Sequence, residues 1–130
     1  MLMRFRTHDI VLIGDIEKAF LQIEVHEADR DYLRFLWLND EGELITYRFA
    51  RVPFGLTSSS FLLNATLRHH MENRCLKEGN PELLAILSKA HYVDDWILGA
   101  KTPAEVLLIK KWLVEFLEVI GMKLHKFNSN

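Results

Sequence analysis

Two adjacent aspartates, Asp94 and Asp95, interrupt an otherwise apolar run, SKAHYVDDWILGAK, over residues 88–101. Successive side chains of a β-strand point to opposite faces, so one continuous strand would send one of these carboxylates into the core. An unpaired charge in a core is strongly unfavourable. The pair therefore predicts a hairpin bend between two short strands, residues 90–93 and 96–100, with both carboxylates at one edge of a sheet.

Short apolar runs elsewhere in the chain predict further strands. One of them, IVLIGDI, is uniformly apolar until it ends in a charged turn, which suits a buried strand. Two others flank the turn signal NDEG at residues 39–42 and predict an antiparallel hairpin. The strands expected from these runs are Ile10–Ile16, Tyr32–Leu38, Leu44–Val52 and residues 122–127.

Three segments have helical periodicity. The first, residues 61–77, follows serines that can cap it. The second starts after Asn80 as N-cap, with Pro81 at its first position. The third, residues 104–120, has a capping box at Thr102 and Glu105 and ends at Gly121. Helices and hairpin-connected strands mix without strict alternation, which predicts an α+β domain: an antiparallel sheet with helices packed on one face.

Composition sets limits on the class of protein. A chain of 130 residues with 49% hydrophobic and 26% charged residues is typical of one globular domain. Its single cysteine, Cys75, excludes an internal disulfide framework and a thiolate metal cluster. A net charge of −2 does not by itself favour a nucleic-acid partner. No apolar run is long enough for a signal peptide or a membrane span, so we expect an intracellular protein without a membrane partner.

A third acid, Asp15, also stands where an apolar strand meets a turn. Ordinary turn chemistry would account for Asp94 and Asp95 alone. Carboxylates from two strand ends, gathered at one sheet edge, are instead the oxygen ligands that a pair of Mg²⁺ ions requires for phosphoryl transfer. The three aspartates therefore suggest a two-metal site, with Mn²⁺ as a possible substitute.

Four motifs in order resemble those of reverse transcriptases. DIEKAF (residues 15–20) resembles the motif of their first catalytic aspartate, RVPFGLTSSSFLLNATLRHHM (residues 51–71) their P-x-G loop and long helix, YVDD (residues 92–95) the YxDD signature, and GMKLHKFNSN (residues 121–130) the motif that closes the palm. The particular residues in these four motifs are similar to those in the polymerases of BEL/Pao-type LTR retrotransposons. The resemblance implies a polymerase palm fold over residues 1–130 and RNA-directed DNA polymerase activity on an RNA or DNA template-primer with dNTPs.

The resemblance implies roles for single residues around the metals. Asp15 and Asp94 would be the principal ligands, with Asp95 as the second acid and the backbone of Ile16 completing a metal site. Asp94 is then expected to be intolerant of Asn. Lys126, with Lys123 as the alternative, would protonate the pyrophosphate leaving group, although a solvated lysine at a strand edge is an equally simple interpretation.

Other residues would contact the nucleotide, the primer or the template. Phe20 would block a ribose 2′-hydroxyl, although it could equally be a core aromatic, and Tyr92 would abut the primer end unless it packs on the sheet. The remaining residues implied to bind are Lys18 and Ala19 beneath the triphosphate, and Pro53, Phe54 and Gly55 in the loop that approaches nucleotide and template.

The histidines are not expected to bind a metal. Adjacent side chains on a helix diverge by about 100°, so His69 and His70 cannot easily share one ion. Together with His91 they are expected to be polar surface or template-side residues. Trp112 and Phe116 are expected in the core.

The resemblance also suggests what lies outside this chain. Fingers, thumb and RNase H are expected in a parent polyprotein, located in the cytoplasm or a virus-like particle, or in the nucleus. Without them, little or no primer extension is expected. Two alternatives are a catalytically silent nucleic-acid-binding or interaction module and an RNA-binding sheet of the RRM type, which the acids at the sheet edge disfavour.

Overall fold

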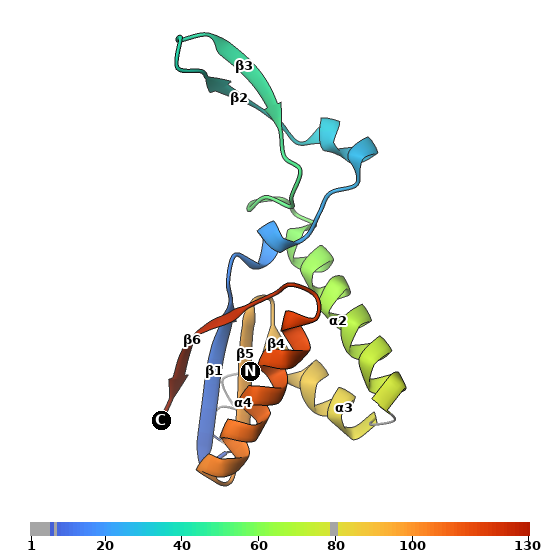
Figure 1. Cartoon of the computed structure of the whole chain (residues 1–130), viewed down its shortest axis with the longest axis vertical. Helices are drawn as coiled ribbons and strands as arrows, with labels where there is room; N and C mark the ends of the chain where they lie inside the picture. The colour runs from blue at the N-terminus through green and yellow to red at the C-terminus, as the bar shows by residue number, and fades with distance from the viewer. Residues whose placement is uncertain (1–5, 7, 79–80) are drawn as a thin grey trace.

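The structure is a computed structural model that describes residues 6, 8–78 and 81–130. Its centre is a four-stranded antiparallel sheet in the order β4-β5-β1-β6 (Figure 1). The strands are β1 (Ile10–Ile16), β4 (His91–Tyr92), β5 (Asp95–Ala100) and β6 (Leu124–Ser129). The helices are α2 (Ser59–Glu78), α3 (Pro81–Ala90) and α4 (Pro103–Glu118), and two 3-10 turns, η1 (Ala19–Gln22) and η2 (Glu27–Tyr32), precede the hairpin β2 (Arg34–Leu38) and β3 (Leu44–Arg48).

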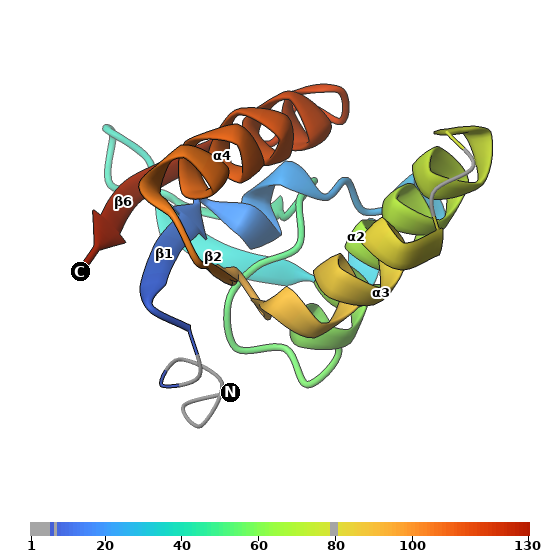
Figure 2. The same cartoon turned by 90° about the horizontal axis from the view of Figure 1, so that it is seen from below.

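One face of the sheet forms the core. Leu12 lies opposite Leu98 in the β1–β5 register, and alternate residues of both strands point the same way. Those side chains pack in one buried cluster with Leu113 and Phe116 of α4. Seen from below, α4 lies across the sheet and α2 and α3 lie side by side next to it (Figure 2). The expected α+β fold, compatible with a polymerase palm, is confirmed.

Helix α4 begins and ends at the expected signals. The Thr102 side chain accepts a hydrogen bond from the Glu105 N–H at 3.3 Å, while Glu105 Oε2 accepts from the N–H of Lys101 rather than from that of Thr102. At the other end Gly121 has a φ of 75°, and the N–H of Met122 donates to the Leu117 carbonyl at 3.0 Å. This left-handed glycine closes the helix.

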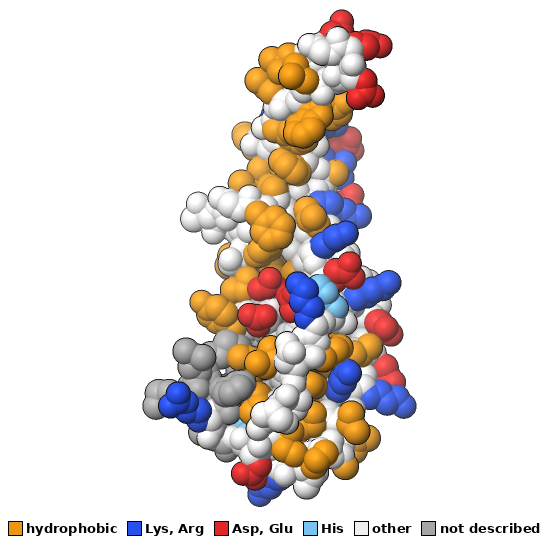
Figure 3. Space-filling view, turned by 90° about the vertical axis from the view of Figure 1, so that its left-hand side faces the viewer, with side chains coloured by type: hydrophobic (Ala, Val, Ile, Leu, Met, Phe, Trp, Pro, Cys, Tyr) orange, Lys and Arg blue, Asp and Glu red, His pale blue; other side chains and the backbone are white. Residues whose placement is uncertain are grey.

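The hairpin β2–β3 forms a sheet of its own that stands away from the four-stranded sheet (Figure 1). Arg34 and Arg48 both pair with Asp31 at its base and lower the pKa of that carboxyl by hydrogen bonding. Hydrophobic side chains run along it (Figure 3), and its exposed members are Leu36, Trp37, Leu38, Leu44 and Tyr47.

Several expected boundaries are wrong. Tyr32 belongs to η2 instead of a strand, and β3 ends at Arg48, four residues early. Strand β6 covers Leu124–Ser129 instead of residues 122–127. At the start of α2, the Ser59 hydroxyl donates to the Pro53 carbonyl at 2.8 Å, so it anchors the preceding loop rather than capping the helix. The expected cap at Asn80 lies outside the described residues.

Within the described residues, the helices lack the length and apolar character needed to span a membrane.

Candidate functional site

Strand register places two of the acids opposite each other. In the β1–β5 pairing, Asp15 is the direct partner of Asp95 at the end of both strands. Asp15 is half-buried and Asp95 is exposed. Directly opposed residues of an antiparallel pair have neighbouring side chains on the same face. Both carboxylates therefore lie on the sheet face opposite the helices, because Asp15 alternates with the buried Ile16.

The third acid lies in the turn that joins β4 to β5. Tyr92 pairs with Asp95, so the bend consists of Val93 and Asp94. The expected bend at Asp94 and Asp95 is therefore one residue too late, and Asp95 is the first residue of β5. Val93 has a φ of 58°, a conformation in which a β-branched residue is strained. The Asp94 carbonyl accepts a hydrogen bond from the Ile16 N–H at 3.0 Å, which ties the turn to β1.

The three carboxylates form a compact group. One oxygen of each lies within 4.8 Å of the others, and within the described part of the chain this is the only set of three or more acidic, histidine or cysteine side chains with such spacing. The pKa of Asp95 is raised above its ordinary value. Loss of hydration is the largest cause, and repulsion from the charges of Asp94 and Asp15 adds to it. The set offers hard oxygen donors and excess negative charge, which fits divalent cations such as Mg²⁺.

Two side chains of β6 approach the same acid. His125 Nε2 lies 3.1 Å and Lys126 Nζ 3.7 Å from Asp15 Oδ2. Figure 3 shows acidic side chains meeting a basic side chain and a histidine on one face of the molecule, below the hairpin. Lys126 therefore lies near the Asp15 carboxylate, and its role as a proton donor stays a prediction; His125 was not anticipated. Lys123 contributes its backbone carbonyl to the Glu17 N–H.

The expected nucleotide-side residues meet next to β1. Phe20 is 8% exposed and packs edge-on against Phe54, with ring centroids 5.2 Å apart, so it belongs to the core and also faces the loop. Phe54 itself is 68% exposed. Gly55 has a φ of 88°, which favours glycine, and Pro53 is buried. The structure thus brings the loop and the aromatic residue together.

Three further expected site residues differ in exposure. Lys18 is exposed and left-handed, with a φ of 51°, at the start of η1. Ala19 is buried in the core. Tyr92 is 64% exposed on β4, directly opposite Asp95, so its ring does not pack in the core.

Two histidines outside β6 have structural partners. His70 lies 2.7 Å from the Phe116 carbonyl and His91 2.9 Å from Asn64 Oδ1. Both rings are half-buried, whereas His69 is exposed, so His69 alone lies fully on the surface among these three; a template-side position stays a prediction for all of them. Burial lowers the pKa of His91.

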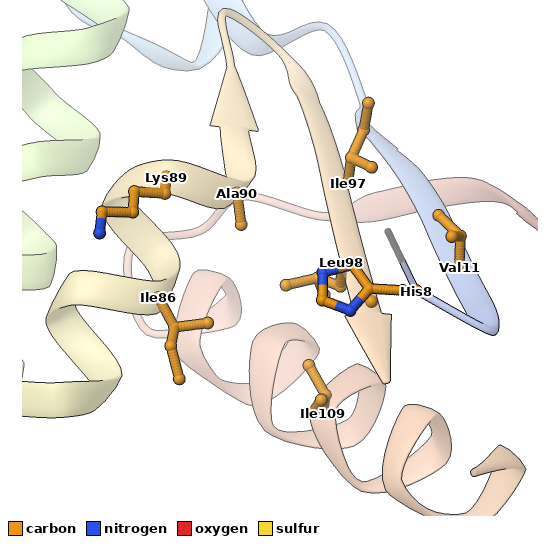
Figure 4. Close-up of a pocket in the computed structure, with 9 residues that line it drawn as sticks. His8, Val11, Ile86, Lys89, Ala90, Ile97, Leu98 and Ile109 are labelled. Carbon is orange, nitrogen blue, oxygen red and sulfur yellow. The ribbon is translucent and has the colours of Figure 1, made fainter. Parts of the chain in front are cut away.

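A separate hollow lies farther along β5, away from the carboxylates. Figure 4 shows His8 lying over this strand, with Ile86 and Ala90 of α3 and Ile109 of α4 on the other sides. Its volume is about 310 Å³. A Cβ on Gly99 would collide with the His8 ring, so this glycine permits the close approach. The hollow contains none of the expected site residues.

Comparison with known protein families identifies the family of this chain. The model for reverse transcriptase (RNA-dependent DNA polymerase) matches residues 2–127. The chain belongs to the reverse transcriptase family. A search of curated proteins finds no match. Reverse transcriptases are RNA-directed DNA polymerases that act on a template-primer and dNTPs with divalent metal, and the acidic group of this member lies within the matched residues.

Proposed function

We propose that this chain is the palm of an RNA-directed DNA polymerase that joins a deoxynucleotide to a primer 3′-hydroxyl by a two-metal mechanism. The observation that carries the proposal is the group formed by Asp15, Asp94 and Asp95, whose oxygens lie within 4.8 Å of one another. Membership of the reverse transcriptase family supports the same chemistry.

The acidic group would hold two Mg²⁺ ions, with the backbone of Ile16 as a further ligand. When bound, such a pair stabilises both the attacking and the leaving oxygen of a phosphoryl displacement. The protein contributes positioning: the β1–β5 register aligns Asp15 with Asp95, and the Ile16 N–H holds the Asp94 turn. Positioning and charge stabilisation supply most of the catalysis in phosphoryl transfer.

The neighbouring residues would bind the substrates. Lys126 carries a proton at Nζ near the carboxylates and would donate it to the pyrophosphate. Phe20, held by packing against Phe54, would exclude a ribose 2′-hydroxyl. Lys18 and Ala19 would lie beneath the triphosphate, Tyr92 at the primer end, and Pro53 to Gly55 along nucleotide and template.

We also propose that this chain comes from a BEL/Pao-type LTR retrotransposon, because the residues of its four motifs resemble those of such polymerases. In that case the palm would act with fingers, thumb and RNase H of a parent polyprotein, in the cytoplasm or a virus-like particle. The single chain should then show little or no primer extension, because most of the grip on triphosphate and primer would come from those parts. Robust extension by the purified chain would contradict this dependence.

Isothermal titration with Mg²⁺ and Mn²⁺ tests the metal site directly. The unmodified chain should bind either ion, and Asp94→Asn should abolish binding. Asp40→Asn is a matched control, since it removes one exposed carboxylate in the β2–β3 turn. If the unmodified, folded chain binds neither Mg²⁺ nor Mn²⁺, that result would contradict the proposal and favour a catalytically silent module.

A further inference from the structure

Strand β6 is irregular beside the acidic group. Along β1 the register advances two residues, from Ile13 to Asp15, while along β6 it advances three, from Asn128 to His125. Lys126 lies within this extra length and has a φ of 50°. An extra residue in one strand of an antiparallel pair is a β-bulge, and bulges near functional sites commonly redirect side chains.

The bulge changes which side chains share a face. In a regular strand His125 and Lys126 would point to opposite faces. Here both approach the same oxygen, Asp15 Oδ2, at 3.1 and 3.7 Å. The flanking Leu124 and Phe127 instead both pack against the core cluster. Two adjacent polar residues thus stand on the acidic side, between two apolar residues that hold the strand to the core.

Packing on the helix side holds the bulge in place. The Phe127 ring lies against Gly14, so close that a Cβ there would be 3.0 Å from Phe127 Cε1. Lys110 of α4 places its Nζ 4.0 Å from the centre of the same ring, a cation–π contact. These contacts of Phe127 with β1 and α4 hold the strand two residues after His125, and so limit where His125 can lie.

We infer that His125 is a positioning residue that holds the Asp15 carboxylate through Oδ2 and so orients it toward a divalent cation, an inference that rests on the proposed function. His125 fits this role better than Lys126, because it is closer to Oδ2 and its side chain is 34% exposed against 71%. A short, half-buried imidazole holds one position better than a long solvated ammonium. Groups that hydrogen-bond a metal-binding side chain commonly fix its orientation in proteins.

Mn²⁺ titration of the full chain in mildly alkaline buffer tests the inference. His125→Ala should weaken Mn²⁺ binding by on the order of tenfold, the usual effect of losing a group that hydrogen-bonds a metal ligand. His125→Gln keeps an N–H donor of similar reach and should restore most of the affinity. His69→Ala, which removes an exposed histidine of α2, should leave it unchanged. Thermal melting of each variant without metal reports folding separately.

The outcomes distinguish this inference from the proposed function. Wild-type affinity in His125→Ala, together with no binding by Asp94→Asn, would overturn the positioning role and leave the metal site standing. If His125→Ala does not fold, His125→Gln and His125→Asn carry the comparison, because the Asn amide is one methylene shorter; equal, wild-type affinity in both would overturn the role. An unmodified chain that binds no Mn²⁺ would refute the proposed function itself.

Discussion

Asp15 and Asp95 stand directly opposite each other at the ends of two neighbouring antiparallel strands. Like charges in this position destabilise a sheet. Asp94 adds a third negative charge within 4.8 Å, and the pKa of Asp95 is raised in part by both neighbours. Three carboxylates therefore repel one another at a point where an uncharged pair would make the fold more stable. Such a group of like charges is expected where a cation binds.

Removing one of these charges should stabilise the metal-free chain. Asp95→Asn is expected to raise the free energy of unfolding by on the order of 0.5 kcal/mol in EDTA, because it relieves the repulsion across the β1–β5 pair. The same variant should lose most of the stabilisation that Mn²⁺ gives the unmodified chain. Thermal melting with and without Mn²⁺ measures both effects, with Asp40→Asn as the control. A lower melting temperature in EDTA would mean that Asp95 stabilises the fold.

The raised pKa of Asp95 also predicts a pH dependence. The folded chain keeps this proton at pH values at which the unfolded chain, with an ordinary value near 3.8, has released it. The contribution of Asp95 to stability therefore falls as the pH rises from that value through the raised pKa of the folded state. In EDTA, the melting-temperature difference between Asp95→Asn and the unmodified chain should grow over this acidic range and then level off. A constant difference would contradict the shift.

The sequence contained enough to locate the acids but not their exact register. Alternation requires a bend near Asp94 and Asp95, yet a bend at Val93 and Asp94 satisfies the same requirement. The structure has the latter bend, because Tyr92 pairs with Asp95 and leaves only Val93 and Asp94 between the two strands. A β-branched residue such as Val93 gives no local signal for a left-handed turn position, so turn chemistry could not have found it.

His125 was missed for a different reason. Read as a regular strand, LHKF places Leu124 and Lys126 on one face and His125 and Phe127 on the other. The three-residue spacing between the two apolar residues is the signal of the bulge, because both pack against the core. A spacing of three within a strand could have been noticed, but only the contacts of Phe127 with Gly14 and Lys110 show that the bulge forms.

The Phe20–Phe54 contact should be measurable as a coupling energy. Phe20→Ala is expected to cost about 3 to 5 kcal/mol because the ring is buried. Phe54→Ala should cost about 1 kcal/mol, since that ring is mostly exposed and loses chiefly the aromatic pair. Chemical denaturation of both single variants and the double variant gives the coupling, expected near 1 kcal/mol. Strict additivity would show that the edge-on contact contributes nothing.

Helix α4 should depend on its cap. Thr102→Ala removes the acceptor for the Glu105 N–H and is expected to cost about 1 kcal/mol of unfolding free energy. Thr66→Ala is a matched control inside α2, where the hydroxyl only donates to the Leu62 carbonyl. It should be neutral or slightly stabilising, because Ala is the better helix former. Equal losses in both variants would argue that the cap has no special role.

Two substitutions at Lys126 distinguish the effect of the left-handed backbone in the bulge from the effect of the lysine side chain. Lys126→Gly and Lys126→Ala both remove the amine near Asp15, so the two variants differ mainly in their tolerance of a φ of 50°. Ala in this left-handed region is disfavoured by about 1 to 2 kcal/mol, whereas Gly is not. The Gly variant should therefore melt at a clearly higher temperature than the Ala variant. Equal melting temperatures would show that β6 has no left-handed residue there. If the Gly variant also exceeds the unmodified chain, the lysine at this position costs stability, as expected of a residue kept for its ammonium group beside the carboxylates rather than for the fold.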